Sequence, residues 1–211
     1  MRRDGLIFGG LLGLGFAILG GLYAWSTNGV QAQSDAEVID TGGPYLVIDV
    51  AAGSDAGASG RVVVDLRDDV APAHAERLIT LAERGAYDGV VFHRVIDGFM
   101  AQTGDVQFGQ AGGDLSRAGM GGSDLPNLPA EFSRLPFQRG VLGMARSQSP
   151  DSANAQFFIM FAPAPHLDGQ YTVVGRVVEG MEVVDAIRRG DPARNGAVAE
   201  PDRMERVEVR R

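Results

Sequence analysis

Residues 92–105 read Phe-His-Arg-Val-Ile-Asp-Gly-Phe-Met-Ala-Gln-Thr-Gly-Asp. This stretch predicts a strand that runs into a glycine turn and then a second short strand. Strand alternation places Phe92, Arg94 and Ile96 on one face. An arginine among such neighbours either extends along apolar surface to solvent or is held for directional hydrogen bonding. Taken alone, the stretch favours the first of these alternatives.

The segments around this stretch predict a mostly β protein. Residues 45–50 and 61–66 are rich in β-branched residues and flank a Gly/Ser/Asp cluster, which indicates a hairpin. Pro72 opens a helix whose apolar residues recur at helical spacing, and Gly85 predicts its end. Further elements are predicted as strands at 140–145, 156–160, 171–178 and 203–209, and as a helix at 181–189. Without alternation of strands and helices, this inventory fits a barrel or sandwich closed by both ends of the chain.

Composition excludes several classes of function. The chain of 211 residues is long enough for one sizeable core, and its net charge of −8 opposes binding to nucleic acid. It contains no cysteine, and all 19 basic residues are arginine, so thiolate and lysine chemistry are excluded. The three histidines are too scattered to form a metal motif, and we predict no metal site.

The N-terminal segment has the pattern of a membrane segment. Arg2 and Arg3 precede a run from Leu6 to Trp25 without any charge, long enough to cross a bilayer as a helix. A retained anchor and a signal peptide cleaved after Ala32 remain alternatives, and a buried core helix is disfavoured because the run is apolar all round. We therefore expect a signal peptide or transmembrane anchor at 1–25, a flexible tether at 26–43 and a folded domain at 44–211.

Two further motifs follow residues 92–105 in order: Gln156-Phe157-Phe158-Ile159 and Leu167-Asp168-Gly169. At this spacing the three motifs resemble the signature segments of cyclophilins, and the resemblance covers residues 44–211. It implies a closed antiparallel β-barrel capped by two α-helices. It also implies a peptidyl-prolyl cis/trans isomerase that acts on proline-containing polypeptides and needs no cofactor, nucleophile or metal. This context favours an arginine held for hydrogen bonding at position 94.

The resemblance also implies roles for individual residues. Arg94 corresponds to the catalytic arginine, and Gln102 to the residue that orients the substrate backbone. The substrate-binding residues are the pocket walls Phe99, Met100, Phe158 and Leu167, the groove residues Ala145, Arg146 and Gln156, and the rim residues His166 and Tyr171. Three of these depart from the family pattern: His166 replaces a frequent tryptophan, Tyr171 a frequent histidine and Arg146 a frequent asparagine.

Other interpretations of the chain remain open at this point. A proline-peptide binding or chaperone module with incidental isomerase activity would keep the apolar pocket without needing Arg94. A membrane-tethered scaffold for a fixed partner is a third class. The glycine-rich string at 119–123 is predicted to be a mobile surface loop. We expect a monomer that assists the folding of exported proteins on the periplasmic side of a bacterial inner membrane.

Overall fold

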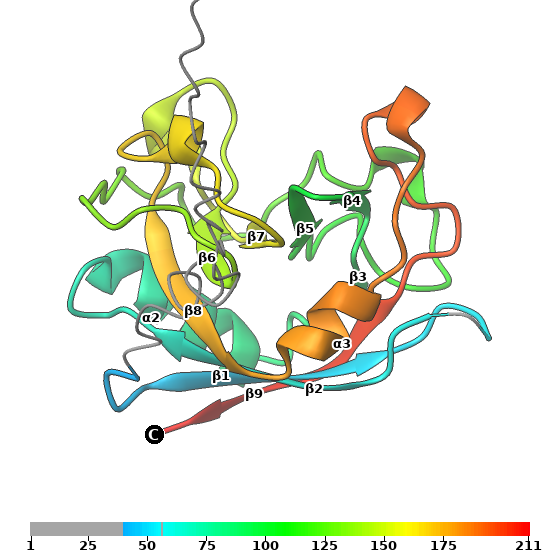
Figure 1. The fold of residues 1–211 in the computed structure, drawn as a ribbon, viewed down its shortest axis with the longest axis horizontal. Coiled ribbons are helices and arrows are strands. Elements are labelled where there is room, and N and C mark those ends of the chain that lie inside the picture. The colour runs from blue at the N-terminus through cyan, green and yellow to red at the C-terminus, as the bar shows by residue number, and fades with distance from the viewer. Residues whose placement is uncertain (1–39, 56) are drawn as a thin grey trace, which may run out of the picture. The chain divides into compact units, whose positions relative to one another are not determined.

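The computed structural model describes residues 40–55 and 57–211, which build one antiparallel sheet with two α-helices (Figure 1). The order of strands across the sheet is β3-β9-β1-β2-β8-β6-β7-β5-β4. The strands are β1 (Tyr45–Ala51), β2 (Gly60–Leu66), β3 (Val90–Val91), β4 (Arg94–Ile96), β5 (Met100–Thr103), β6 (Val141–Met144), β7 (Phe157–Met160), β8 (Val173–Glu179) and β9 (Arg203–Arg210). The α-helices are α2 (Pro72–Glu83) and α3 (Met181–Ala186). The mostly β prediction is confirmed.

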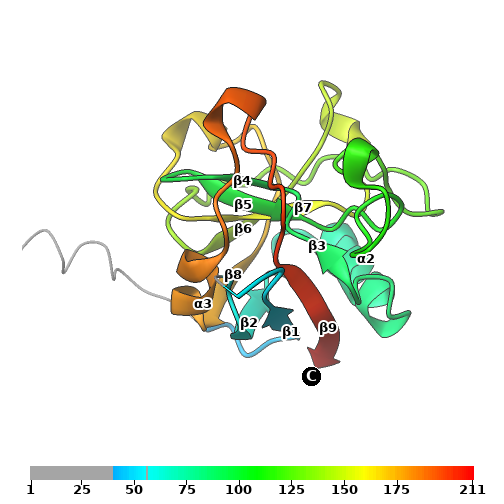
Figure 2. The same cartoon turned by 90° about the vertical axis from the view of Figure 1, so that its right-hand side faces the viewer.

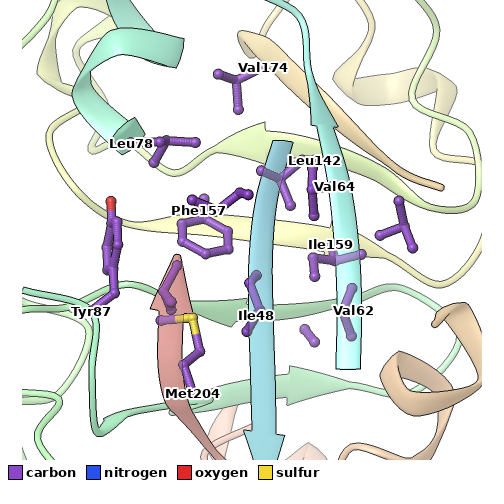
Figure 3. Close-up of a cluster of buried hydrophobic side chains, with 14 of the residues drawn as sticks. Ile48, Val62, Val64, Leu78, Tyr87, Leu142, Phe157, Ile159, Val174 and Met204 are labelled. Atoms are coloured by element: carbon purple, nitrogen blue, oxygen red, sulfur yellow. The ribbon is translucent and has the colours of Figure 1, made fainter. Parts of the chain in front are cut away.

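The hairpin of β1 and β2 supplies the middle of the sheet. Its register pairs Leu46 with Val64 and Ile48 with Val62, and β9 pairs with the other edge of β1. Alternate side chains of β1 therefore point to one face, where they pack with residues from β6 and β7. Figure 3 shows this core, in which Phe157 lies among side chains that come from distant parts of the chain. The terminal strand β9, which the sequence predicted, contributes Met204 and Val207 to this core.

Helix α2 covers the core for the reason the sequence pattern indicates. Pro72 occupies its first turn, and Leu78 and Ile79 lie on its buried face. Gly85 follows with a φ of +66°, a conformation that ends helices readily because glycine has no Cβ. Helix α3 is shorter than predicted, since the backbone of Ile187 is extended and ends the helix at Ala186.

The sheet curls strongly, but it is not a closed barrel. Figure 2 shows β4 to β7 above β1, β2 and β9, with β8 between them. Among the described residues, the edge strands β3 and β4 share no ladder, because β3 pairs with β9 and β4 with β5. The chain itself joins these edges through Phe92 and His93. The predicted closed antiparallel β-barrel is therefore corrected to a curled antiparallel half-barrel with two helices.

The same two-residue connection overturns the predicted face of Phe92. Phe92 lies outside both strands and packs in the main core, whereas Ile96 packs against a separate cluster on the other side of the sheet. Strand alternation does not extend across Phe92 and His93 because these two residues belong to neither strand and connect β3 to β4. Arg94 and Ile96 alone share the predicted face.

The predicted membrane segment at 1–25 and most of the tether at 26–43 lie outside the described residues. Within residues 40–55 and 57–211, no helix is long and apolar enough to cross a membrane. Thr41 and Gly43 already contact the folded part, since both backbone N–H groups donate to the Asp65 carboxylate at 2.9 and 3.2 Å. The domain boundary at Pro44 stays a prediction.

Candidate active site

The β4–β5 hairpin places two polar side chains opposite each other. Arg94 pairs with Gln102 and Ile96 with Met100 across the hairpin, whose turn contains Gly98 at a φ of +66°. Because strand side chains alternate, Arg94 and Gln102 project to the same side of the sheet. The glycine turn in the sequence therefore sets the register that brings them together.

Strand β7 separates its two adjacent phenylalanines. Phe158 lies opposite Gln102 of β5 and belongs to a second apolar cluster, while Phe157 belongs to the main core. The Phe158 ring stacks on Phe137 at a centroid distance of 5.8 Å and meets Tyr171 edge-on at 5.9 Å. These contacts restrict the orientation of the Phe158 ring, so the second cluster forms a well-packed apolar wall.

A cavity of about 320 Å³ opens over this wall. It is lined by Arg94, Phe99, Met100, Gln102, Ala145, Arg146, Phe158, His166, Leu167 and Tyr171. These are all the residues predicted for the site except Gln156, which lines an adjoining cavity. His166 is exposed at the rim and stacks on Phe99 at 5.7 Å. The structure thus brings together residues that lie far apart in the sequence.

Arg94 is held by three hydrogen bonds to oxygen atoms at the side of this cavity. Its Nη1 donates to Gln102 Oε1 at 3.1 Å, its Nε to the backbone oxygen of Asn195 at 3.1 Å, and its Nη2 to Asn195 Oδ1 at 3.1 Å. Nη1 also contacts Met100 Sδ at 4.0 Å. A guanidinium has five N–H groups, so the second N–H on Nη2 is left for another acceptor. Burial lowers the pKa of Arg94, an effect that Tyr171 partly opposes, but an arginine stays protonated at neutral pH.

A chain of side-chain amides continues from Arg94. Gln102 Nε2 donates to Gln156 Oε1 at 3.0 Å, and Gln156 Nε2 donates to the backbone oxygen of Gly121 at 2.8 Å. Because arginine only donates, the direction of every bond in this chain is determined. Gln102 and Gln156 are therefore oriented as well as positioned, and the chain ends on the loop around Gly121.

Comparison with known protein families identifies the family of this chain. Residues 47–209 match the family model described as "Cyclophilin type peptidyl-prolyl cis-trans isomerase/CLD". The chain belongs to the cyclophilin family. A probable peptidyl-prolyl cis-trans isomerase of Brucella suis is 60% identical over 147 residues, which cover 69% of this chain and 75% of that protein. Peptidyl-prolyl cis-trans isomerase-like 1 of Aspergillus fumigatus is 40% identical over 129 residues, covering 59% of this chain and 74% of that protein.

A solved structure supports the fold of this cyclophilin. The crystal structure of cyclophilin AquaCyp293 from Hirschia baltica superposes with a TM-score of 0.63 at 23% identity, covering 78% of this chain and 73% of that one. The family match and the relatives above, and not this structure, show that the chain is a peptidyl-prolyl cis-trans isomerase, as its motifs predicted.

Two parts of the cyclophilin site were missed in the sequence. Asn195 follows Arg94 by 101 residues and binds it at two atoms, yet its sequence context indicates only a turn. The glycine-rich loop at 119–123 was predicted to be mobile. Instead, Gly119 and Gly121 donate their N–H groups to the buried Asp105 carboxylate at 2.7 and 2.9 Å, and the loop lines the adjoining cavity.

Proposed function

We propose that the cavity over Phe158 binds the proline ring of a polypeptide and that Arg94 catalyses rotation of the preceding peptide bond. The observation that carries this proposal is the Arg94 guanidinium, held at three N–H groups by Gln102 and Asn195 beside an apolar cavity. Phe99, Met100, Phe158 and Leu167 are the proposed walls for the ring.

The chemistry of the reaction matches this arrangement. Rotation of an X-Pro bond breaks amide conjugation across a barrier of about 18–20 kcal/mol, and no bond is cleaved. The lone pair of the prolyl nitrogen becomes available only in the twisted state. A free N–H of Arg94 that donates to this lone pair stabilises the twisted amide more than the planar one, and it thereby lowers the barrier.

The apolar walls and the polar residues have separate tasks. The walls immobilise the ring and exclude water, so rotation is confined to the bond before proline and the charge on Arg94 is less screened. Gln102 is the proposed contact for the substrate backbone. Ala145, Arg146 and Gln156, with His166 and Tyr171, form the proposed groove for the residues next to the proline.

A proline-isomerisation assay on a short X-Pro peptide tests this proposal. We expect the full-length chain to accelerate isomerisation and Arg94→Ala to lower kcat/KM at least about 100-fold, the scale of losing a directed donor to a transition state. Arg206→Ala is the matched control, because it removes one exposed arginine on β9. Full activity in Arg94→Ala would refute the role of Arg94, and proline-peptide binding without acceleration in the wild type would favour the binding-module alternative.

We also propose that this isomerase assists the folding of exported proteins on the periplasmic side of a bacterial inner membrane, as a monomer. Arg2 and Arg3 before the uncharged run from Leu6 to Trp25 support export. Protease accessibility in spheroplasts tests on which side of the inner membrane the domain lies. The N-terminus of the mature protein distinguishes a retained anchor from a cleaved signal peptide. If protease cleaved the domain only after the spheroplasts were lysed, that result would contradict export.

A further inference from the structure

Arg146 lies where two cavities of the groove meet. It lines the cavity proposed for proline and also the adjoining cavity of about 590 Å³, together with Gln102 and Ala145. The adjoining cavity is bounded by the loop around Gly121 and by polar side chains such as Asn154. A peptide whose proline occupies the first cavity must pass Arg146 as it enters the second.

The guanidinium of Arg146 is held by uncharged groups. Its Nε and Nη2 donate to the backbone oxygen of Gln170 at 3.2 and 2.9 Å, and its Nη1 donates to that of Ser147 at 2.9 Å and to that of Gln148 at 3.3 Å. It also stacks on the ring of Tyr171, with its central carbon 4.3 Å from the centroid. These contacts fix the position of the cation without neutralising it.

Ten other arginines in the described part of the chain are instead paired with carboxylates. Arg139, for example, forms an ion pair with Asp185. Within the described part of the chain, Arg146 forms no ion pair, and neither cavity is lined by an aspartate or glutamate. Arg94 and Arg146 therefore make the groove locally positive in a protein whose net charge is −8. Such a groove attracts an anionic group on a substrate and repels a cationic one.

We propose that this isomerase prefers X-Pro bonds with an aspartate or glutamate within two residues of the proline, whose carboxylate pairs with Arg146. The inference rests on the proposed function, because it places the proline ring beside Phe158. A guanidinium with four of its five N–H groups engaged by carbonyls retains one for the substrate carboxylate. Since the pair lies at the edge of solvent, its effect on kcat/KM is moderate and falls with salt.

The test compares peptides that differ at one position. Glutamate, glutamine or lysine is placed one or two residues before or after the proline, and isomerisation by the full-length chain is measured at 20 mM and at 500 mM salt. At the best position, we expect kcat/KM for the glutamate peptide to exceed that for the glutamine peptide about threefold to tenfold at low salt. The lysine peptide ranks below both, and high salt reduces the ratio towards one.

Two variants assign the preference to Arg146. We expect Arg146→Gln to bring the glutamate-to-glutamine ratio close to one, and Arg206→Gln, which changes the net charge equally, to leave the ratio unchanged. The readout is a ratio within one variant, so it does not depend on the absolute activity of that variant.

The outcomes separate this inference from the proposed function. Rapid isomerisation of all peptides without a preference for glutamate overturns the inference and leaves the proposed function intact. A preference that persists in Arg146→Gln also overturns it, because Arg94 or another charge is then responsible. Absence of acceleration for every peptide refutes the proposed function and the inference together.

Discussion

Asn195 accepts two hydrogen bonds from Arg94, one at its backbone oxygen and one at Oδ1, each at 3.1 Å. It has a φ of +54° and is the only residue other than glycine with a positive φ in the described part of the chain. With this left-handed backbone, Asn195 presents both of its oxygens to one guanidinium. Asn195 is therefore a positioning residue for Arg94 in the proposed mechanism.

Asn195→Gly tests this role while keeping a residue that adopts positive φ. The variant loses Oδ1 and retains the backbone oxygen, so we expect kcat/KM to fall about fivefold, the scale of one partly exposed hydrogen bond to a charged group. KM changes little because Asn195 does not line the cavity proposed for proline. Arg194→Gly loosens the same turn without touching Arg94 and serves as the control. Equal losses in both variants would show that loop flexibility is the cause.

Gln102→Leu removes the acceptor for Arg94 Nη1 and interrupts the amide chain. We expect kcat/KM to decrease about tenfold, because Arg94 then has more freedom and the substrate backbone loses a polar contact. Gln156→Leu interrupts only the distal part, so we expect a decrease of about threefold. Isomerisation kinetics on one peptide compare the two, and a larger loss in Gln156→Leu would contradict the proposed order of importance.

Asp105→Asn tests the anchor of the 119–121 loop. The buried carboxylate accepts N–H groups from Gln107 and Phe108 as well as from Gly119 and Gly121. An amide replaces one acceptor oxygen with a donor that faces these N–H groups, so we expect the free energy of unfolding to fall by about 2–4 kcal/mol. Urea denaturation measures the loss, and hydrogen exchange at Gly119 and Gly121 locates it.

The control for this loop is Asp114→Asn, at an exposed aspartate that accepts one backbone N–H, from Ser116. We expect its unfolding free energy to change by less than about 1 kcal/mol. Comparable destabilisation in the two variants would contradict the special role of Asp105.

The buried position of His93 leads us to expect a loss of stability in acid. Burial lowers the pKa of His93 to about 4 from the ordinary value of 6.5, so the unfolded chain binds a proton that the folded chain does not between these values. The free energy of unfolding therefore increases with pH across this window, and acidification from pH 6.5 to 4 removes up to about 3 kcal/mol. Urea denaturation at several pH values measures it.

The comparison for this prediction is His93→Leu, which has no proton to gain at this position. We expect the slope of its unfolding free energy against pH between 4 and 6.5 to be smaller than that of the wild type. The difference in slope corresponds to about one bound proton. The same pH dependence in both proteins would show that other groups are responsible for acid unfolding.

Local patterns in the sequence determined much of the architecture. β-Branched runs predicted β1 and β2, and Pro72 with Gly85 predicted the extent of α2, because these signals act within a few neighbouring residues. The family resemblance, which three motifs in order carried, predicted the residues that line the cavity proposed for proline. Alternation also separated Phe157 from Phe158, since side chains on one strand point to opposite faces.

Only the tertiary structure decided how the sheet ends and what holds Arg94. Phe92 and His93 belong to neither β3 nor β4, and Phe92 packs in the core. The two edge strands are connected by this piece of chain and share no ladder. Asn195 reaches Arg94 across 101 residues, and Asp105 holds Gly121 from a different segment. No local pattern carries such contacts, because they depend on the curl of the whole sheet, which packing of the complete core determines.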